Sequence, residues 1–418
     1  MIKNNIIYNS ASDWSFNLKK AKGSYIWTTT DKKILDFTSG WNVTNLGWNN
    51  SEINKALIDQ VRKNVYAPME TADSMQNDLA EKLTNSLPPS LTAVGRTTGG
   101  VESNEEAIKT ARAFTKRSKI LGFHHGYHGQ SISMLSAVLE ENEMKEIGPQ
   151  ISSVVRMEYP AVFRSKLSEE ELLREFGEKL EKILKYEDIA AILSEPGIIT
   201  GWGSTYVAPK GFTTLVRQLT KKYGTLLILD EVGTGFSRCG ELYGMHIEDI
   251  VPDVVTFAKG FSNGAAAIGA MVTTSEIADK TWQVTNLQST FGWTPVACAA
   301  ALKNLQIHLR DKVWEKSKKD GEYMKKVLTK ELWNLDNVGD VRGYGMEIGI
   351  CFVDNKDKRT PDENLAKKVV SDAFQKGLYI LYGSDGNIQL MPPLIINRKD
   401  LDKGLEILIN TVKKINTS

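Results

Sequence analysis

Apolar and polar residues follow two different periods along the chain, and each period predicts a different kind of element. Residues 51–65 and 72–87 carry apolar side chains at helical spacing, and Pro88 and Pro89 end the second of these helices. Residues 25–37 contain two short apolar runs around a polar Asp-Lys turn, which predicts two strands.

From about residue 92 the pattern becomes a short apolar run, a glycine turn and a helix, repeated several times. Three of these runs are "IAAILS", "TLLILD" and "VVTF". They lack the strict alternation of a half-exposed strand, as expected for strands that are buried on both faces. The repeated order predicts an α/β fold with a largely parallel sheet between helices.

After residue 309 the pattern of apolar and charged residues changes. Charged amphipathic helices are expected at 312–332 and 361–376, and they flank short strands. This pattern predicts a smaller α+β domain, which the N-terminal strands join because they have no core of their own. We expect residues 1–50 and 306–418 to form the small domain and residues 51–305 the large one, since 418 residues exceed one ordinary core.

Composition narrows the possible partners. The chain is 41% hydrophobic and 25% charged with a net charge of +1, which gives no reason to expect nucleic acid or an anionic membrane as partner. The N-terminus lacks the apolar core of a signal peptide, and no apolar run is long enough to span a membrane. Three widely spaced cysteines form no metal-binding spacing and fit a reduced, cytoplasmic compartment.

Sites in open α/β sheets lie at the carboxyl ends of the strands, so the residues that follow each strand are the candidates. Gly99 and Gly100 precede a helix, where bare amides can bind phosphate, although most such turns are only turns. Tyr127, in "FHHGYHGQS", can stack on a flat cofactor or simply pack its loop. Glu195, before a proline, can pair with a cation or cap a loop.

Two further strand ends carry charge where solvent is expected to be scarce. Asp230 ends the run "TLLILD", and a buried carboxylate requires a cation or hydrogen-bond donors. Lys259 directly follows "VVTFA"; it is either a lysine that reaches solvent or one with a shifted pKa that forms a Schiff base. A phosphate nest, a stacking ring, a buried acid and a desolvated lysine are together the parts that hold pyridoxal 5'-phosphate (PLP).

The chain resembles the class III, or ω-amino acid type, aminotransferases of PLP fold type I. The resemblance rests on "LILDEVGTGFSRCGELYG", "VPDVVTFAKGFSNGAAAIGA" and "STFGWTPVACAAAL", and it extends over nearly the whole chain. It implies a large domain with a mostly parallel seven-stranded sheet sandwiched by helices, a smaller α+β domain, and an active homodimer or tetramer with sites at the subunit interface.

The resemblance also implies a role for each site residue. Lys259 forms the aldimine and moves the proton at the substrate Cα, while Asp230 pairs with the pyridine nitrogen. Val232 packs under the ring and Tyr127 covers its other face. Gly100 and Val101 are expected to bind the cofactor phosphate through their amides, and His128 is expected to belong to the cofactor site. Thr290 is expected to bind the phosphate of the cofactor in the neighbouring subunit.

Substrate recognition departs from the family pattern. Many relatives carry an arginine shortly before the Pro-Pro pair, but this chain has Gln389 there, and an amide does not replace a guanidinium clamp. Arg164 or Arg398 are the alternatives for binding a carboxylate. Glu195 resembles a glutamate beside the substrate, and the aromatic candidates for the pocket are Trp14, Trp41, Trp48 and Trp202, each of which can equally be core.

These observations favour transfer of an amino group from an amine or ω-amino acid to a 2-oxo acid by a ping-pong mechanism. Racemisation or epimerisation of an amino acid at the same site is the alternative, because the same lysine and electron sink serve Cα deprotonation. A non-catalytic PLP-binding protein fits less well, since Lys259, Asp230 and Tyr127 are all present. Nothing in the sequence suggests a metal.

Overall fold

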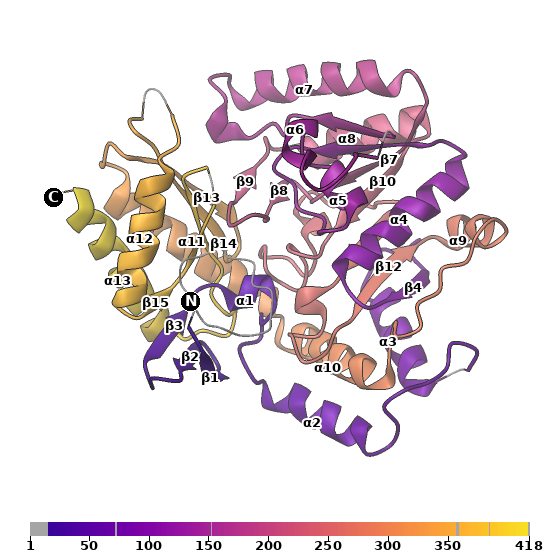
Figure 1. The fold of residues 1–418 in the computed structure, drawn as a ribbon, viewed down its shortest axis with the longest axis horizontal. Helices are drawn as coiled ribbons and strands as arrows, with labels where there is room; N and C mark the ends of the chain where they lie inside the picture. Colours follow the sequence, from indigo (N-terminus) through magenta and orange to yellow (C-terminus); the bar gives the residue numbers. More distant parts are fainter. Residues whose placement is uncertain (1–15, 72, 152, 357–358, 384, 417–418) are drawn as a thin grey trace.

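The computed structural model describes residues 16–71, 73–151, 153–356, 359–383 and 385–416. A large α/β body and a smaller α+β body lie side by side, and the first strands of the chain pack beside its last helices (Figure 1). No helix in these ranges is both long enough and apolar enough to cross a membrane.

The large body is built on a seven-stranded sheet, and β12 is the strand that runs antiparallel to both of its neighbours. The other pairs are parallel, which confirms the predicted mostly parallel sheet. In spatial order the strands are β4 (Ala93–Thr97), β12 (Gly269–Thr273), β11 (Val254–Phe257), β10 (Leu226–Asp230), β7 (Ile189–Ser194), β5 (Lys119–Phe123) and β6 (Val154–Met157).

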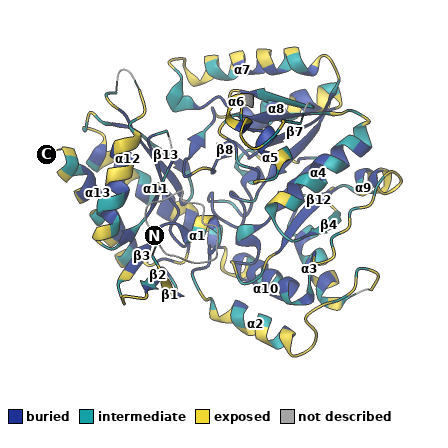
Figure 2. Ribbon diagram, in the orientation of Figure 1, coloured by how far each residue is buried: buried dark blue, intermediate teal, exposed yellow. Residues whose placement is uncertain are grey.

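Helices cover both faces of this sheet (Figure 2). The first four residues of strand β10 show why they are all apolar. Leu227 and Leu229 belong to one core cluster, whereas Leu226 and Ile228 belong to another on the opposite face. Burying each such side chain contributes about 1.5–3 kcal/mol. The first cluster includes residues of α3 (Ser74–Thr84), α7 (Glu169–Leu184), α8 (Phe212–Tyr223) and α10 (Pro295–Asp311); the second includes residues of α4 (Gly100–Thr115), α5 (Ile132–Ser136) and α9 (Ser275–Trp282).

The small body has a second core around a four-stranded antiparallel sheet. Strand β3 pairs in parallel with β15 and thereby joins the N-terminal strands to the C-terminal segment, as predicted. The strands are β13 (Val338–Tyr344), β14 (Glu347–Phe352), β17 (Asn387–Leu390) and β16 (Leu381–Tyr382), with β1 (Leu18–Lys22), β2 (Tyr25–Thr28), β3 (Lys33–Asp36) and β15 (Leu378–Tyr379) in the neighbouring sheet; the helices are α11 (Val313–Leu332), α12 (Glu363–Gln375) and α13 (Arg398–Asn416).

Helix α10 is continuous through the expected boundary between residues 305 and 306 and packs against α3 and against α2 (Ser51–Val61). We therefore propose that the large domain extends to Asp311, where α10 ends. Helix α2 begins at Ser51, the residue expected to be its N-cap; the cap is instead Asn50, whose Oδ1 accepts from the amides of Glu52 and Ile53 at 3.0 and 3.3 Å.

Candidate functional site

A cavity of about 420 Å³, the cofactor cavity, opens at the carboxyl ends of the large sheet's strands. Strands β10 and β11 end beside it, and helix α4 begins there. The cavity brings together seven residues that the sequence singled out: Gly100, Val101, Tyr127, His128, Asp230, Val232 and Lys259.

Asp230 is the last residue of β10 and is 2% exposed. Its Oδ2 accepts from Asn104 Nδ2 at 2.8 Å and lies 2.7 Å from His128 Nδ1, while its Oδ1 accepts from the amide of Val232 at 2.9 Å. A buried carboxyl group requires such partners. Asp230 is therefore held in one orientation, hydrogen-bonded, at the wall of the cavity.

Asn104 was missed by the sequence reasoning. It donates to both Asp230 and the carbonyl of His128, and it accepts from Thr256 Oγ1 at 2.6 Å, so it links helix α4 to two strands. The available signal was an amide one turn into the helix that follows the two glycines. Its fully bonded position makes Asn104 a positioning residue for Asp230.

Glu231 faces away from the cavity, as the alternation of side chains along an extended chain predicts. It is fully buried, with Oε2 accepting from Thr234 Oγ1 and the amide of Gly244 at 2.5 and 2.8 Å, and Oε1 from the amide of Met245 at 2.6 Å. Burial raises the pKa of Glu231 to about 7.

This raised pKa predicts a measurable pH dependence of stability. Between about pH 4.5 and 7 the folded chain holds a proton on Glu231 that the unfolded chain releases, so the free energy of unfolding falls as pH rises through that window. Glu231→Gln should be less stable than the wild type at pH 5, by an amount that shrinks by about 1–3 kcal/mol at pH 7.

Urea unfolding at several pH values measures this difference. Glu175→Gln, on the exposed face of α7, is the matched control, and its offset from the wild type should not vary with pH. A Glu231→Gln offset that stays constant from pH 5 to 7 contradicts the assignment.

Lys259 lies two residues beyond the end of β11, after Ala258, and has a left-handed backbone, with φ of 45°. Such a conformation is costly for a lysine and is typical of functional positions. Its Nζ lies 5.9 Å from the centroid of the Tyr127 ring. Desolvation lowers the pKa of Lys259, while the carboxylates of Glu195 and Asp230 act in the opposite direction. A lowered pKa makes the amine available as a nucleophile.

The start of helix α4, where the sequence predicts a phosphate nest, lines the cofactor cavity. Gly99 is extended and provides no side-chain cap, so the first amides of the helix point toward the cavity without a side-chain acceptor from the cap residue. A Cβ on Gly100 would lie 3.1 Å from a methyl group of Val232, so glycine allows this close packing. Glu102 turns back to accept from the amide and hydroxyl of Thr98.

Thr290 lies in a second hollow of about 610 Å³, formed by residues 98–102 and 288–291 of the same chain. This hollow shares residues Thr98 to Val101 with the cofactor cavity. The predicted contact of Thr290 with a neighbouring subunit stays a prediction.

Glu195 directly follows β7 and is buried without lining the cofactor cavity. Its Oε2 accepts from the amide and the hydroxyl of Thr200 at 2.9 and 2.6 Å, and its Oε1 has no donor. Burial and the charge of Asp230 raise the pKa of Glu195 to about 8.

Trp41 projects from a left-handed turn, α1 (Ser39–Asn42), in which all four residues have positive φ between 46° and 68°. Left-handed residues cost roughly 1–2 kcal/mol each, so the surroundings must hold the turn. The buried guanidinium of Arg238 donates to Ser39 Oγ, Asn45 Oδ1 and the carbonyls of Met346 and Pro392. The turn places Trp41, 40% exposed, at the border between the two domains.

The arginines considered as carboxylate ligands lie elsewhere. Arg164 donates to the carbonyls of Asp385 and Arg359, and Arg398 pairs with Asp320. Neither lines the cofactor cavity. Trp48 donates to the buried Asp36, and Trp14 lies outside the described residues.

Three comparisons place this geometry among known proteins. The family model for "Aminotransferase class-III" matches residues 7–412. An acetylornithine aminotransferase of Archaeoglobus fulgidus is 31% identical over 94% of each chain, and an isoleucine 2-epimerase of Lentilactobacillus buchneri is 30% identical over 93% of this chain and 88% of the relative.

The solved structure of a taurine:2-oxoglutarate aminotransferase from Bifidobacterium kashiwanohense, in complex with PLP and glutamate, superimposes with a TM-score of 0.91 at 28% identity. The match covers 97% of this chain and 96% of that one. The residues of the cofactor cavity fit PLP, because amides without a side-chain cap, a lysine amine with a lowered pKa and a hydrogen-bonded carboxylate meet in one cavity. The chain therefore belongs to the class-III aminotransferases, whose cofactor is pyridoxal 5'-phosphate.

Proposed function

We propose that the protein moves an amino group from an amine or ω-amino acid to a 2-oxo acid in two successive half-reactions. The observation that carries the proposal is the position of Lys259, whose amine has a lowered pKa and shares one cavity with Asp230 and the start of α4. When bound, PLP supplies an aldehyde for the amine and a ring that withdraws the electron pair left at the substrate Cα.

Each residue then has a defined task. Lys259 supplies the primary amine and moves the proton at the substrate Cα, and Asp230 holds a proton on the ring nitrogen. Amides of Gly100 and Val101 bind the phosphate. Tyr127 and Val232, which both line the cavity, would hold the ring, and His128 positions Asp230 through the 2.7 Å contact of its Nδ1.

We further propose a homodimer, or a tetramer built from it, in which Thr290 binds the phosphate of the neighbouring subunit. Support comes from large apolar side chains exposed near the hollow of residues 98–102 and 288–291: Phe291 is 65%, Tyr66 41% and Val101 37% exposed. The Tyr66 and Phe291 rings lie 6.1 Å apart. Exposed apolar patches of this kind are typical of protein interfaces.

A direct assay tests the proposed reaction. The purified protein with PLP is incubated with a panel of amine and ω-amino acid donors and a 2-oxo acid, and chromatography measures the new amino acid. We expect stoichiometric formation of the amino acid and the carbonyl product of the donor. No conversion with any donor of a broad panel would overturn the proposal.

Epimerisation is a second candidate, favoured by the similarity to the isoleucine 2-epimerase. Both reactions begin with removal of the substrate Cα proton, so the same lysine and acid serve either one. Incubation of a single isoleucine stereoisomer without any 2-oxo acid separates them. Loss of stereochemical purity without release of an oxo acid supports epimerisation.

A further inference from the structure

Helix α10 carries a buried asparagine, Asn304, that faces the turn on which Lys259 lies. Asn304 is 0% exposed, and its Nδ2 donates to the carbonyls of Gly260 and Phe261 at 2.9 and 3.1 Å. Its Oδ1 has no hydrogen-bond partner. A buried amide with an unpaired acceptor destabilises the fold. The two bonds to the turn are therefore what a polar side chain contributes at this position.

The turn that carries Lys259 is held only partly by its own backbone. Lys259–Phe261 form a short 3-10 helix, η3, whose first residue is left-handed. The amide of Phe261 donates to the carbonyl of Ala258 at 2.9 Å, but the bonds donated by the next two amides, those of Ser262 and Asn263, are 3.4 Å long. A left-handed residue other than glycine persists only where its surroundings hold it. The bonds from helix α10 supply part of that support.

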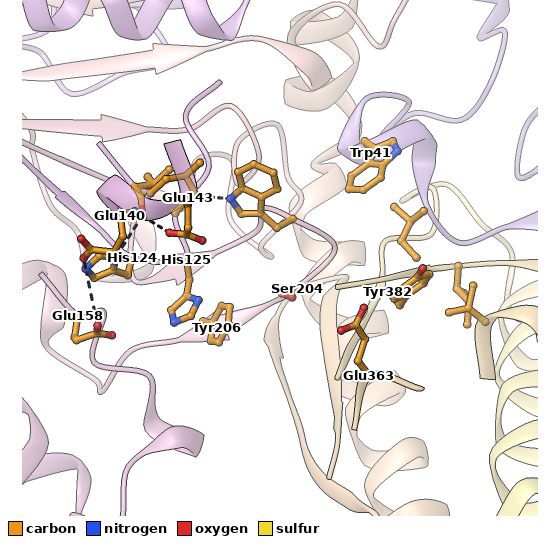
Figure 3. A pocket seen from close by; sticks show the side chains of 17 residues that line it. Trp41, His124, His125, Glu140, Glu143, Glu158, Ser204, Tyr206, Glu363 and Tyr382 are labelled. Carbon is orange, nitrogen blue, oxygen red and sulfur yellow. Dashed lines mark hydrogen bonds and ion pairs between the residues drawn. The ribbon is translucent and has the colours of Figure 1, made fainter. Parts of the chain in front are cut away.

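The direction of the Lys259 side chain depends on this turn. Lys259 lines the cofactor cavity with Tyr127 and does not line the larger cavity of about 750 Å³ beside Trp41 and Tyr382 (Figure 3). Asn304 binds the carbonyls of the two residues that follow Lys259, so it fixes the peptide planes next to the lysine Cα. A small rotation of these planes moves the amine, at the end of a long side chain, farther than it moves the backbone.

Helix α10 does not need Asn304 in order to pack on the large domain. Trp293, just before the helix, donates from Nε1 to the carbonyl of Gly269 at 2.7 Å. Four apolar residues of the helix belong to the core of the large domain: Ala297, Cys298, Ala301 and Leu305. An apolar side chain of similar volume would fill the position of Asn304 without leaving an unpaired oxygen. The amide therefore serves the turn that carries Lys259, not the attachment of the helix.

We infer that Asn304 is a positioning residue for Lys259. By binding the carbonyls of Gly260 and Phe261, it holds the lysine amine in the orientation that meets the aldehyde of PLP. The inference rests on the proposed function, in which Lys259 bonds to the cofactor. In that step the amine condenses with the aldehyde and one water molecule leaves, with no change of oxidation state. Asn304 does not line the cofactor cavity, so its effect belongs to the rate of this step and not to the affinity for the ring and phosphate.

Two ligands of the apoprotein separate these effects in the variant Asn304→Leu, which keeps a similar volume and removes both donors. PLP bonds to Lys259, whereas pyridoxamine 5'-phosphate presents the same ring and phosphate with an amine in place of the aldehyde. We expect the rate constant for bonding of PLP, measured by stopped-flow absorbance, to fall by about tenfold or more, because a small displacement of a reacting group slows a reaction strongly. The Kd for pyridoxamine 5'-phosphate, measured by fluorescence titration, should stay within about twofold of the wild type.

The matched control is Gln60→Leu on helix α2. Gln60 is 4% exposed, and its Nε2 also donates twice, to the carbonyl and the side chain of Asn64, outside the cofactor cavity. This variant should lose stability in urea and react with PLP at the wild-type rate. Asn304→Ser, whose hydroxyl can donate to one carbonyl, should react at a rate between those of Asn304→Leu and the wild type. It carries the comparison if the leucine variant does not unfold cooperatively.

Equal losses in the rate of PLP bonding and in the affinity for pyridoxamine 5'-phosphate would show that Asn304 has only a structural role. A wild-type rate in folded Asn304→Leu, or in Asn304→Ser where the leucine variant does not fold, would overturn the inference while the proposed function stands. If borohydride fixes no PLP on Lys259 of the wild-type chain, the proposed function itself fails, and the inference fails with it.

Discussion

Replacement of Lys259 by alanine should reduce amino transfer by about 10⁴-fold or more, because the variant loses both the nucleophilic amine and the group that moves the Cα proton. The amides of α4 and the carboxylate of Asp230 remain, so PLP should still bind, although more weakly. The measurements are steady-state formation of the amino acid and a fluorescence titration of the apoprotein with PLP.

The matched control is Lys280→Ala on helix α9, where the lysine pairs with Glu276 at the surface. That variant should retain wild-type turnover. A second readout is independent of turnover: borohydride treatment followed by peptide mass spectrometry should locate the cofactor on the peptide that contains Lys259 in the wild type only. Retention of full turnover in Lys259→Ala would show that another group performs the chemistry.

Much of the large domain could be predicted from the sequence because its strands are local signals. The runs at residues 189–194, 226–230 and 254–257 are short, apolar and followed by turns, and the structure forms strands at those residues. The order of the strands in the sheet could not be predicted in this way. Strand β12 lies between β4 and β11, and no local pattern shows that an antiparallel strand occupies that place.

The candidate site could be predicted where a side chain lies at or just beyond the end of a strand, as for Asp230 and Lys259. The partners of these side chains that come from distant segments could not be predicted. Asn104 is 126 residues from the carboxylate it binds, and its contact depends on how helix α4 packs on the sheet. The same holds for Gln389, whose bonds to Thr200 and Glu347 join three segments. The sequence could show that an arginine is missing there but could not show what replaces it.

Asp230→Asn should keep the fold but lower kcat by about 10²–10⁴-fold with a smaller change in KM, because a neutral amide does not hold a proton on the cofactor ring. The hydrogen bonds explain why the variant should fold. The oxygen of the introduced amide can still accept from the backbone of Val232, and His128 can accept from its nitrogen after a change of tautomer, while the bond from Asn104 Nδ2 is lost. Exchange of the substrate Cα hydrogen in deuterium oxide measures the affected step directly.

Asp253→Asn is the matched control. Asp253 is another hydrogen-bonded aspartate of the large domain, but it pairs with Arg217 and accepts from the amide of Leu227 outside the cofactor cavity. It should lose stability and keep kcat, whereas Asp230→Asn should lose kcat with a smaller loss of stability. If both variants instead lose stability alike and both retain kcat, Asp230 is only a structural anchor for Asn104 and His128, and the ring nitrogen does not depend on it.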